Sequence, residues 1–223
     1  MIIHVANPIY DSVFKYIMED ERIAKTILSA LLKKEVVHVT VRPHEYCKTT
    51  RETLSMYRID FAATVREKEG NEIKDRIVLI ELQKTWLNTE TLRFRQYLGA
   101  QYNNKNNIRE ADEKGYAYPM VAVYLLGHKV GNIKEPIVYV NHDVFDYNGN
   151  VVAEGNAEPF VESLTHNSII VQIPRLQGNV NNRLEKVLSV FDQTNVEGDT
   201  QQVLKIDEDK YADDNDMMYV LHK

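Results

Sequence analysis

Two acidic residues stand where strand-like segments end or break, and their residue types are suited to metal chemistry. Ile77–Ile80 is a continuous apolar run typical of a strand buried on both faces, and Glu81 follows it directly. Asp60 interrupts an earlier strand-like segment, residues 57–63. A charge at the end of a buried segment is costly unless it is paired or binds a metal. Asp60 and Glu81 are therefore the first candidates for a functional site.

The residues between these segments predict a hairpin that would bring the two acids together. Residues 66–72 are polar and charged, and Gly70 with Asn71 is the expected tip of a turn. A hairpin sets its two strands side by side, so Asp60 and Glu81 would belong to one cluster. Gln83 would lie on the same face as Glu81, because side chains in a strand alternate between faces.

A hard cation such as Mg²⁺ fits this arrangement. It prefers oxygen ligands, usually one or two carboxylates together with waters and a substrate phosphate. Asp60, Glu81 and the backbone carbonyl of Leu82 are the candidate ligands, and Gln83 or Lys84 is placed to orient a water. A bound metal lowers the pKa of such a water and stabilises charge on a phosphodiester. Acids on neighbouring strands also form structural salt bridges, and the spacing alone leaves both interpretations open.

Other chemistries find little support in the sequence. It contains no G-x-S-x-G, G-x-x-x-x-G-K-[ST] or G-x-G-x-x-G motif. Its seven histidines show no H-x-x-x-H spacing. The single cysteine, Cys47, excludes an internal disulfide and a multi-cysteine zinc site, and it fits a cytoplasmic protein.

Length and composition indicate a soluble globular protein. The chain has 223 residues, of which 43% are hydrophobic and 27% charged, enough for one domain or a domain with an appendage. No apolar run approaches the ~20 residues needed to span a bilayer. The first residues lack the charged region and cleavage site of a signal peptide. We therefore expect a cytoplasmic protein without membrane association.

Charge is distributed unevenly along the chain. The net charge of −6 argues mildly against nucleic-acid binding. Residues 196–223 hold much of the acidity, however, and residues 83–109 carry an excess of positive charge. Phosphate contacts require a local basic surface and not a basic protein, although a solvated helix face explains the same excess. The bases of this stretch are Lys84, Arg93, Arg95, Lys105 and Arg109, facing only Glu90.

The hydrophobic pattern predicts alternating helices and strands, and hence an α/β fold with a mixed sheet formed through a crossover connection. The expected elements are helices starting at Asn7–Pro8 and after Asp20, a strand over residues 36–41, a helix from Asn88 or Thr89 to about Arg109, and a strand over residues 119–126. The polar run 103–107 leaves open an earlier end for the third helix.

The second half of the chain has a different character. Short strands are expected over residues 137–140, 144–147, 151–152 and 168–173, followed by a helix capped by Asn181 or Asn182. We therefore divide the chain into a core (1–130), a β-rich extension packed on the core and ending in a short helix (131–195), and an acidic C-terminal segment (196–223). That segment ends on Met217–Leu221, an apolar run that should require a partner.

Several of these features together resemble one enzyme family. Residues 7 to about 126 resemble the PD-(D/E)XK nuclease superfamily, and most of all its recombination-promoting nuclease and putative transposase (Rpn-like) branch. The resemblance implies an α/β restriction-endonuclease-like core, a central mixed sheet flanked by helices. It also implies Mg²⁺-dependent cleavage of DNA, with Mn²⁺ as a substitute. The matching residues are Asn7, Pro8, Asp11, Phe14, Lys15, Asp60, Glu81–Gln83, Arg95–Tyr97, Gly115 and Tyr116.

Carried over to this chain, the resemblance assigns Asp60 and Glu81 as metal-binding acids. Gln83 stands where most of the superfamily has a lysine, as is common in this branch. Because glutamine is neutral, the resemblance does not assign the residue that activates the water. Lys84 would point to the other face of a regular strand.

Accessory roles follow from the same resemblance. Asp11 is either an additional acid at the site or an i,i+4 partner of Lys15. Arg95 is expected to contact phosphate or to bridge to Glu81, and Trp86 belongs either to the core or to the rim of the site. The expected nucleic-acid contacts are Lys15, Lys84, Arg93, Arg95 and Lys105.

Three functional hypotheses follow. The first is a Mg²⁺-dependent endonuclease acting on DNA. The alternative is a catalytically weak or inactive protein of nuclease fold that binds nucleic acid or a protein partner. The third is an interaction protein that forms a homodimer through Met217–Leu221.

Overall fold

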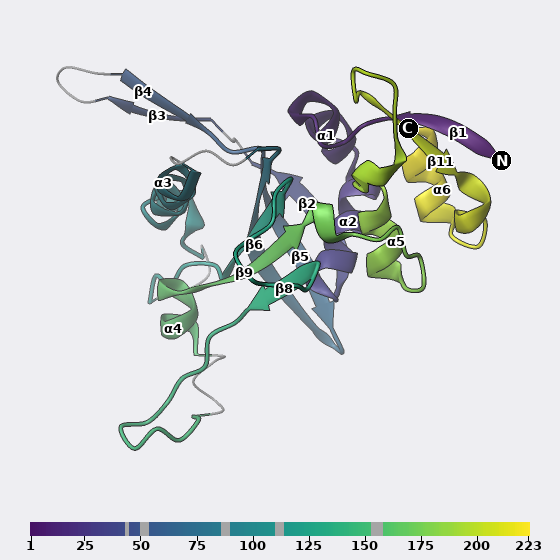
Figure 1. The fold of residues 1–223 in the computed structure, drawn as a ribbon. Helices are drawn as coiled ribbons and strands as arrows, with labels where there is room; N and C mark the ends of the chain where they lie inside the picture. The colour runs from purple at the N-terminus through teal and green to yellow at the C-terminus, as the bar shows by residue number, and fades with distance from the viewer. Residues whose placement is uncertain (43–44, 50–53, 86–89, 110–113, 153–157) are drawn as a thin grey trace.

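A six-stranded mixed sheet forms the centre of the computed structural model, which describes residues 1–42, 45–49, 54–85, 90–109, 114–152 and 158–223 (Figure 1). Three neighbouring strands, β6, β7 and β9, run parallel, and the remaining pairs are antiparallel. The predicted α/β class with a mixed sheet is thereby confirmed. In spatial order the strands are β2 (Glu35–Val41), β5 (Phe61–Glu69), β6 (Glu72–Gln83), β7 (Met120–Leu126), β9 (His166–Gln172) and β8 (Ile137–Val140).

Helices cover both faces of this sheet (Figure 1). The helices α1 (Asp11–Met18), α2 (Glu21–Leu32) and α5 (Arg183–Ser189) lie on one side, and α3 (Glu90–Tyr102) lies on the other. Strand β6 alternates accordingly. Its residues Val78 and Ile80 belong to the core with α1 and α2, whereas Leu79 packs with Tyr97 of α3. Side chains at the end of β6 are thus directed to two different surroundings.

The predicted hairpin between the acid-bearing segments is present. Strands β5 and β6 pair antiparallel, and Gly70 at the turn has a φ of 62°, which a residue without a Cβ adopts readily. The turn is shorter than residues 66–72, because both strands continue through these charged residues. Arg66 and Asp75 face each other across the ladder, and Arg66 Nε lies 2.8 Å from Asp75 Oδ1. Such opposite-charge pairs stabilise neighbouring strands.

The segment 57–63, predicted as one strand, is divided at Asp60. Strand β4 (Leu54–Arg58) ends before this residue and β5 begins after it at Phe61. β4 pairs with β3 (Glu45–Thr49) in a two-stranded hairpin that projects away from the sheet (Figure 1). The physical reason for the break is the Asp60 carboxylate, which bonds to the backbone of β6 and occupies a place where the ladder would otherwise continue.

The predicted start is wrong for the first N-terminal helix and correct for the second. α1 begins at Asp11 and not at Asn7, because the buried Asn7 side chain instead accepts from Ile9 N (3.1 Å) and donates to the carbonyl of Gln201 (2.8 Å). Asp20 caps α2 as predicted, accepting a hydrogen bond from Arg22 N at 3.0 Å.

Helix α3 ends at Tyr102, directly before the polar run 103–107, which corresponds to the early end that the sequence allowed and not to Arg109. Asn104 then accepts from Asn106 N (3.0 Å) and caps a 3₁₀ turn, Lys105–Asn107. Asparagine competes with the helix in this way because its short side chain bonds to nearby backbone groups. The predicted cap at Asn88 or Thr89, and Trp86, lie outside the described residues.

In the second half of the chain, the predicted strands 137–140 and 168–173 correspond to β8 and β9, which belong to the central sheet. Residues 144–152 form only an isolated bridge, Phe145 to Val151. The reason is Asp146, whose carboxylate accepts from Asn148 N (2.8 Å) and Asn150 N (2.9 Å) and folds the segment into a compact turn. A short helix, α4 (Pro159–Leu164), precedes β9, and Asn182 caps α5.

The acidic C-terminal segment is folded and packs within the chain. β10 (Val196–Glu197) and β11 (Val203–Asp207) form a three-stranded sheet with β1 (Ile2–Ala6), in the order β1-β11-β10. The last helix, α6 (Asn215–His222), buries Met217 and Leu221 in the core shared with α1 and α2. The apolar run thus finds partners in its own chain, which removes the motive for docking on a second copy.

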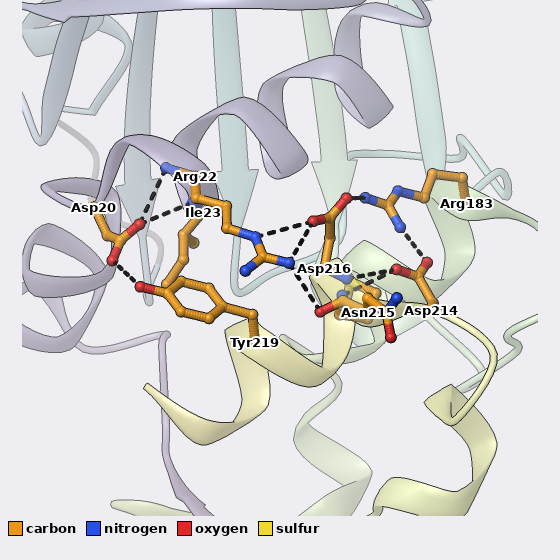
Figure 2. A network of polar contacts seen from close by, with 9 residues as sticks. Asp20, Arg22, Ile23, Arg183, Asp214, Asn215, Asp216 and Tyr219 are labelled. Carbon is orange, nitrogen blue, oxygen red and sulfur yellow. Dashed lines mark hydrogen bonds and ion pairs between the residues drawn. The ribbon is translucent and has the colours of Figure 1, made fainter.

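Acids of this segment are neutralised by bases of the α2–α5 layer (Figure 2). Arg22 Nε lies 3.0 Å from Asp216 Oδ1, and Arg183 contacts both Asp214 and Asp216. Tyr219 completes the network by donating to Asp20 Oδ2 at 2.8 Å. Among the described residues, no helix is long and apolar enough to cross a membrane.

Candidate functional site

Asp60 lies beside the end of β6, at the point where pairing with β5 has ended. The last paired residues are Phe61 and Ile80. Beyond them, Asp60 Oδ2 accepts a hydrogen bond of 2.6 Å from the backbone N–H of Leu82, which satisfies a donor that the ladder no longer uses. Because Leu82 is bonded to Glu81, the carboxylate of Asp60 is fixed next to the backbone of its predicted partner.

The neighbouring side chains of Asp60 come from α1. Lys15 Nζ lies 2.6 Å from Asp11 Oδ1 and 3.7 Å from Asp60 Oδ1. The side chains of Lys15 and Asp60 are each only 14% exposed. Burial raises the pKa of Asp60 to about 6, and the hydrogen bond and charge of Asp11 add to this rise. The Leu82 N–H and the Lys15 ammonium act in the opposite direction on the same pKa.

Lys84 reaches the same side of the sheet. Its Nζ donates to the hydroxyl of Tyr10 at 3.0 Å and lies 4.2 Å from the centre of that ring. Tyr10 is the N-cap residue of α1, so Lys84 comes to the start of the helix that carries Asp11 and Lys15. We call these five residues (Tyr10, Asp11, Lys15, Asp60 and Lys84) the α1-face cluster.

Glu81 and Gln83 lie on the α3 side and share one partner. Arg93 Nη2 donates to Glu81 Oε1 at 2.7 Å and also to Gln83 Oε1. Gln83 Nε2 in turn donates to the carbonyl of Thr85 at 2.6 Å. Glu81 is buried, being 4% exposed, so the arginine supplies the charge that makes its ionised form tolerable. As predicted from strand alternation, Glu81 and Gln83 lie on one face of β6 and Lys84 lies on the opposite face.

The prediction of one cluster for Asp60 and Glu81 is therefore wrong, because the predicted site residues are divided between two groups on opposite sides of the end of β6. Asp60 joins Asp11 and Lys15, whereas Glu81 joins Gln83 and Arg93. Within the described part of the chain, no group of three or more His, Cys, Asp or Glu side chains is placed to hold a metal ion. The carboxylates of Asp11 and Asp60, which both approach the Lys15 ammonium, nevertheless offer the hard oxygen atoms that a cation such as Mg²⁺ prefers.

The backbone of β6 directs one further oxygen toward Asp60. The carbonyl of Gln83 accepts from Gly127 N at 2.7 Å, on the β7 side of the strand. Successive carbonyls of a strand point to opposite sides, so the carbonyl of Leu82 points to the β5 side, where Asp60 lies. The predicted backbone ligand is therefore on the same side of β6 as the Asp60 carboxylate.

Among the predicted arginines, the bridge to Glu81 is made by Arg93 and not by Arg95. Two residues correspond to about 200° of rotation around a helix, so these side chains point in different directions, and Arg95 is exposed. Arg109 Nη2 lies 3.5 Å from Glu162 Oε2, and Lys105 is exposed. The basic residues of the segment 83–109 therefore lie in several separate environments.

Sequence reasoning missed Tyr10 completely. No motif could reveal it, because its contact with Lys84 spans 74 residues. The pairing of Arg93 with Glu81 had a weak signal in the local excess of bases. The region brings two carboxyl groups and the Lys15 ammonium together, with Lys84 nearby at Tyr10, at the end of an inner strand of the mixed sheet. No protein-family model, no curated protein and no solved structure matches this chain.

Proposed function

We propose that this protein is a Mg²⁺-dependent, transposase-like DNA endonuclease with a restriction-endonuclease-like core, in which Mn²⁺ can replace Mg²⁺. The observation that carries the proposal is the convergence of the Asp11 and Asp60 carboxyl groups on the Lys15 ammonium at the end of β6, at 2.6 and 3.7 Å. Two like charges this close oppose each other's ionisation, and a divalent cation between them would remove that cost. Lys15 offsets only part of it.

The donor set in this region fits a hard cation. Asp60 and Asp11 would hold it together with the carbonyl of Leu82. Glu81 lies on the other face of β6, so it would join them only if it left Arg93 and the end of the strand turned. When bound, such an ion lowers the pKa of a water and stabilises charge on a phosphodiester. The chain's own part is to fix Asp60 through the Leu82 N–H, to bring Lys15 beside the carboxylates and to hold Lys84 at Tyr10, the residue before Asp11.

The arrangement of elements supports the proposed core. A helix bearing Asp11 precedes the hairpin β5–β6, which carries Asp60 at its beginning and Glu81 near its end. α3 then leads to β7, which runs parallel to β6. This is the order in which the resembling residues occur along the sequence.

One observation favours the alternative, a protein of nuclease fold that binds nucleic acid or a protein partner without cleaving. Arg93 already neutralises Glu81 and also bonds Gln83. An ion pair with a buried glutamate is costly to break, since the glutamate would be left with its charge uncompensated. In that case Glu81 would remain a structural residue, and Asp11 and Asp60 alone would face a cation.

A cleavage assay on supercoiled plasmid separates the two. With Mg²⁺ or Mn²⁺ the proposed enzyme converts the plasmid to nicked or linear forms, and EDTA prevents it. Asp60→Asn and Glu81→Gln should each lower the rate at least ~100-fold, the scale associated with losing a key electrostatic group. Asp143→Asn and Glu158→Gln, which change exposed acids outside the site, are the matched controls.

The outcomes are distinct. If the wild-type protein leaves the plasmid intact with either ion, or if Asp60→Asn and Glu81→Gln cut as fast as the controls, the endonuclease proposal is wrong. Calorimetry with Mn²⁺ then decides the alternative. A non-catalytic protein in which Glu81 is structural would bind Mn²⁺ equally well as wild type and as Glu81→Gln, or not at all.

A further inference from the structure

We infer that nucleic acid binds on the α1 side of the sheet, where Lys15 and Lys84 hold its phosphates, and that this binding requires a divalent cation in the α1-face cluster. The inference rests on the proposed function and adds to it the surface, the contacts and the order of binding. It is carried by the charge count of the cluster and by the placement of its two lysines.

The charges of the cluster cancel in the protein alone. The carboxylates of Asp11 and Asp60 both approach the Lys15 ammonium, and a second ammonium, that of Lys84, is bonded to Tyr10, the residue before Asp11. These four charges sum to zero. A polyanion gains little from a neutral cluster, because binding strength follows the positive charge presented to its phosphates. A divalent cation held by the carboxylates would change the balance to two net positive charges. Cation and nucleic acid should therefore strengthen each other's binding by the same factor.

The two lysines are placed to make phosphate contacts once this happens. Lys84 is exposed, and its ammonium is held over Tyr10 by the hydroxyl at 3.0 Å. Tyr10 is itself fixed, since its hydroxyl lies 3.1 Å from the carbonyl of Thr200, to which it donates. Lys15 is already committed to Asp11 and Asp60, and a cation on these carboxylates would release its ammonium.

The α3 side offers a poorer surface. Arg93 is held by Glu81 and Gln83, and Arg109 lies beside Glu162. A cation held by Asp11 and Asp60 would release neither of them, and if Glu81 moved to the cation, Arg93 would keep its bond to Gln83. Arg95 and Lys105 are exposed on this side and provide the rival set of phosphate contacts. Variants of these two residues therefore test the rival surface.

The experiment measures the anisotropy of a labelled DNA duplex mixed with the full chain at pH 7.5, in Ca²⁺, in Mg²⁺ before cleavage begins, and in EDTA. Lys15→Met and Lys84→Met are compared with Arg95→Met and Lys105→Met. Lys205→Met, an exposed lysine on β11, is the neutral control. Thermal unfolding verifies that each variant is folded. Lys84 is the safer of the two test positions because its side chain lies at the surface.

We expect the wild-type protein to bind at least ~10-fold more tightly with a divalent cation than in EDTA. With the cation, Lys84→Met should weaken binding roughly 10-fold and reduce the salt slope by about one, as expected for one lost phosphate contact. Lys15→Met should behave similarly. In EDTA, Lys15→Met and Lys84→Met should approach the wild-type affinity. Arg95→Met and Lys105→Met should stay within about twofold of the wild-type affinity with either ion.

Two results would overturn the inference and leave the enzyme proposal intact. One is metal-dependent cleavage by a protein whose DNA affinity is unchanged by EDTA. The other is a loss of affinity in Arg95→Met or Lys105→Met while Lys15→Met and Lys84→Met bind normally. A wild-type protein that neither binds nor cuts DNA with either cation would instead reject the proposed function, and the inference with it.

Discussion

The Oδ2 atom of Asp60 accepts a 2.6 Å hydrogen bond from the backbone N–H of Leu82. This single contact divides a predicted strand, ends the β5–β6 ladder and fixes a carboxylate one residue away from Glu81. It also leaves a buried acid beside the Asp11 carboxyl. The consequences for stability and for cation binding can be measured separately.

Stability should decrease with rising pH between about pH 4 and pH 6 in the absence of divalent cations. The pKa of Asp60 is about 6 in the folded protein and near its ordinary value of 3.8 in the unfolded chain. The folded state therefore binds the proton more tightly, and this contribution is complete below pH 4 and lost by about pH 6. The effect amounts to at most about 3 kcal/mol. Urea unfolding at several pH values measures it, and a profile that is flat or rises here contradicts the assignment.

Removing the charge of Asp60 while retaining its acceptor should stabilise the protein. Asp60→Asn keeps an oxygen for the Leu82 N–H and ends the repulsion with Asp11, so it should unfold at higher urea concentration than wild type at pH 7. Asp60→Ala leaves the N–H without that acceptor and should be about 1–3 kcal/mol less stable than Asp60→Asn. Equal stability of the two variants would show that the hydrogen bond contributes nothing.

Divalent cations should stabilise the wild-type protein and not Asp60→Asn. A ligand at 100 times its dissociation constant adds about 2.7 kcal/mol when it binds only the folded state. The midpoint of thermal unfolding at pH 7 should therefore increase with Mn²⁺ or Mg²⁺ in the wild type. Asp143→Asn, an exposed acid elsewhere, should retain the full increase. An identical shift in Asp60→Asn would place the cation at another site.

Arg93 should be required for the buried charge of Glu81. Arg93→Met leaves the carboxylate, whose side chain is 5% exposed, without its ion-pair partner at 2.7 Å. Since Arg93 itself is 35% exposed, solvent reduces the effect, and we expect a loss of about 1–3 kcal/mol at pH 7. Adding Glu81→Gln should recover most of it. Chemical denaturation of the two single variants and the double variant gives the coupling energy, and a value near zero would contradict the pairing.

The Arg183 contacts should hold α6 against α5. Arg183→Met removes the ion pairs with Asp214 and Asp216, which belong to the network of Figure 2. Because Arg183 is 39% exposed, the loss in global stability should be only about 1 kcal/mol. Hydrogen exchange should accelerate in α6, and Arg66→Met on the distant β5–β6 hairpin should leave α6 unchanged. Unaltered exchange in the Arg183 variant would show that apolar burial alone holds the helix.

The sequence by itself determined the elements that depend on local patterns. The apolar run at Ile77–Ile80, the Gly70 turn and the cap at Asp20 are local signals, and the corresponding strand, hairpin and helix start are all present. Alternation along β6 was also sufficient to separate Lys84 from Glu81 and Gln83, since the period of a strand is a property of the backbone.

The tertiary structure decided where each side chain finds its partner. Asn7 donates hydrogen bonds to Gln193 and Gln201, Lys84 donates one to Tyr10, and Arg93 donates one to Glu81. Electrostatic and hydrogen-bond partners depend on distances in space between residues far apart in the chain, and residue type and local spacing carry no record of those distances. For the same reason only the folded chain could place Asp60 beside Asp11 and Lys15 while directing Glu81 to the opposite helix layer.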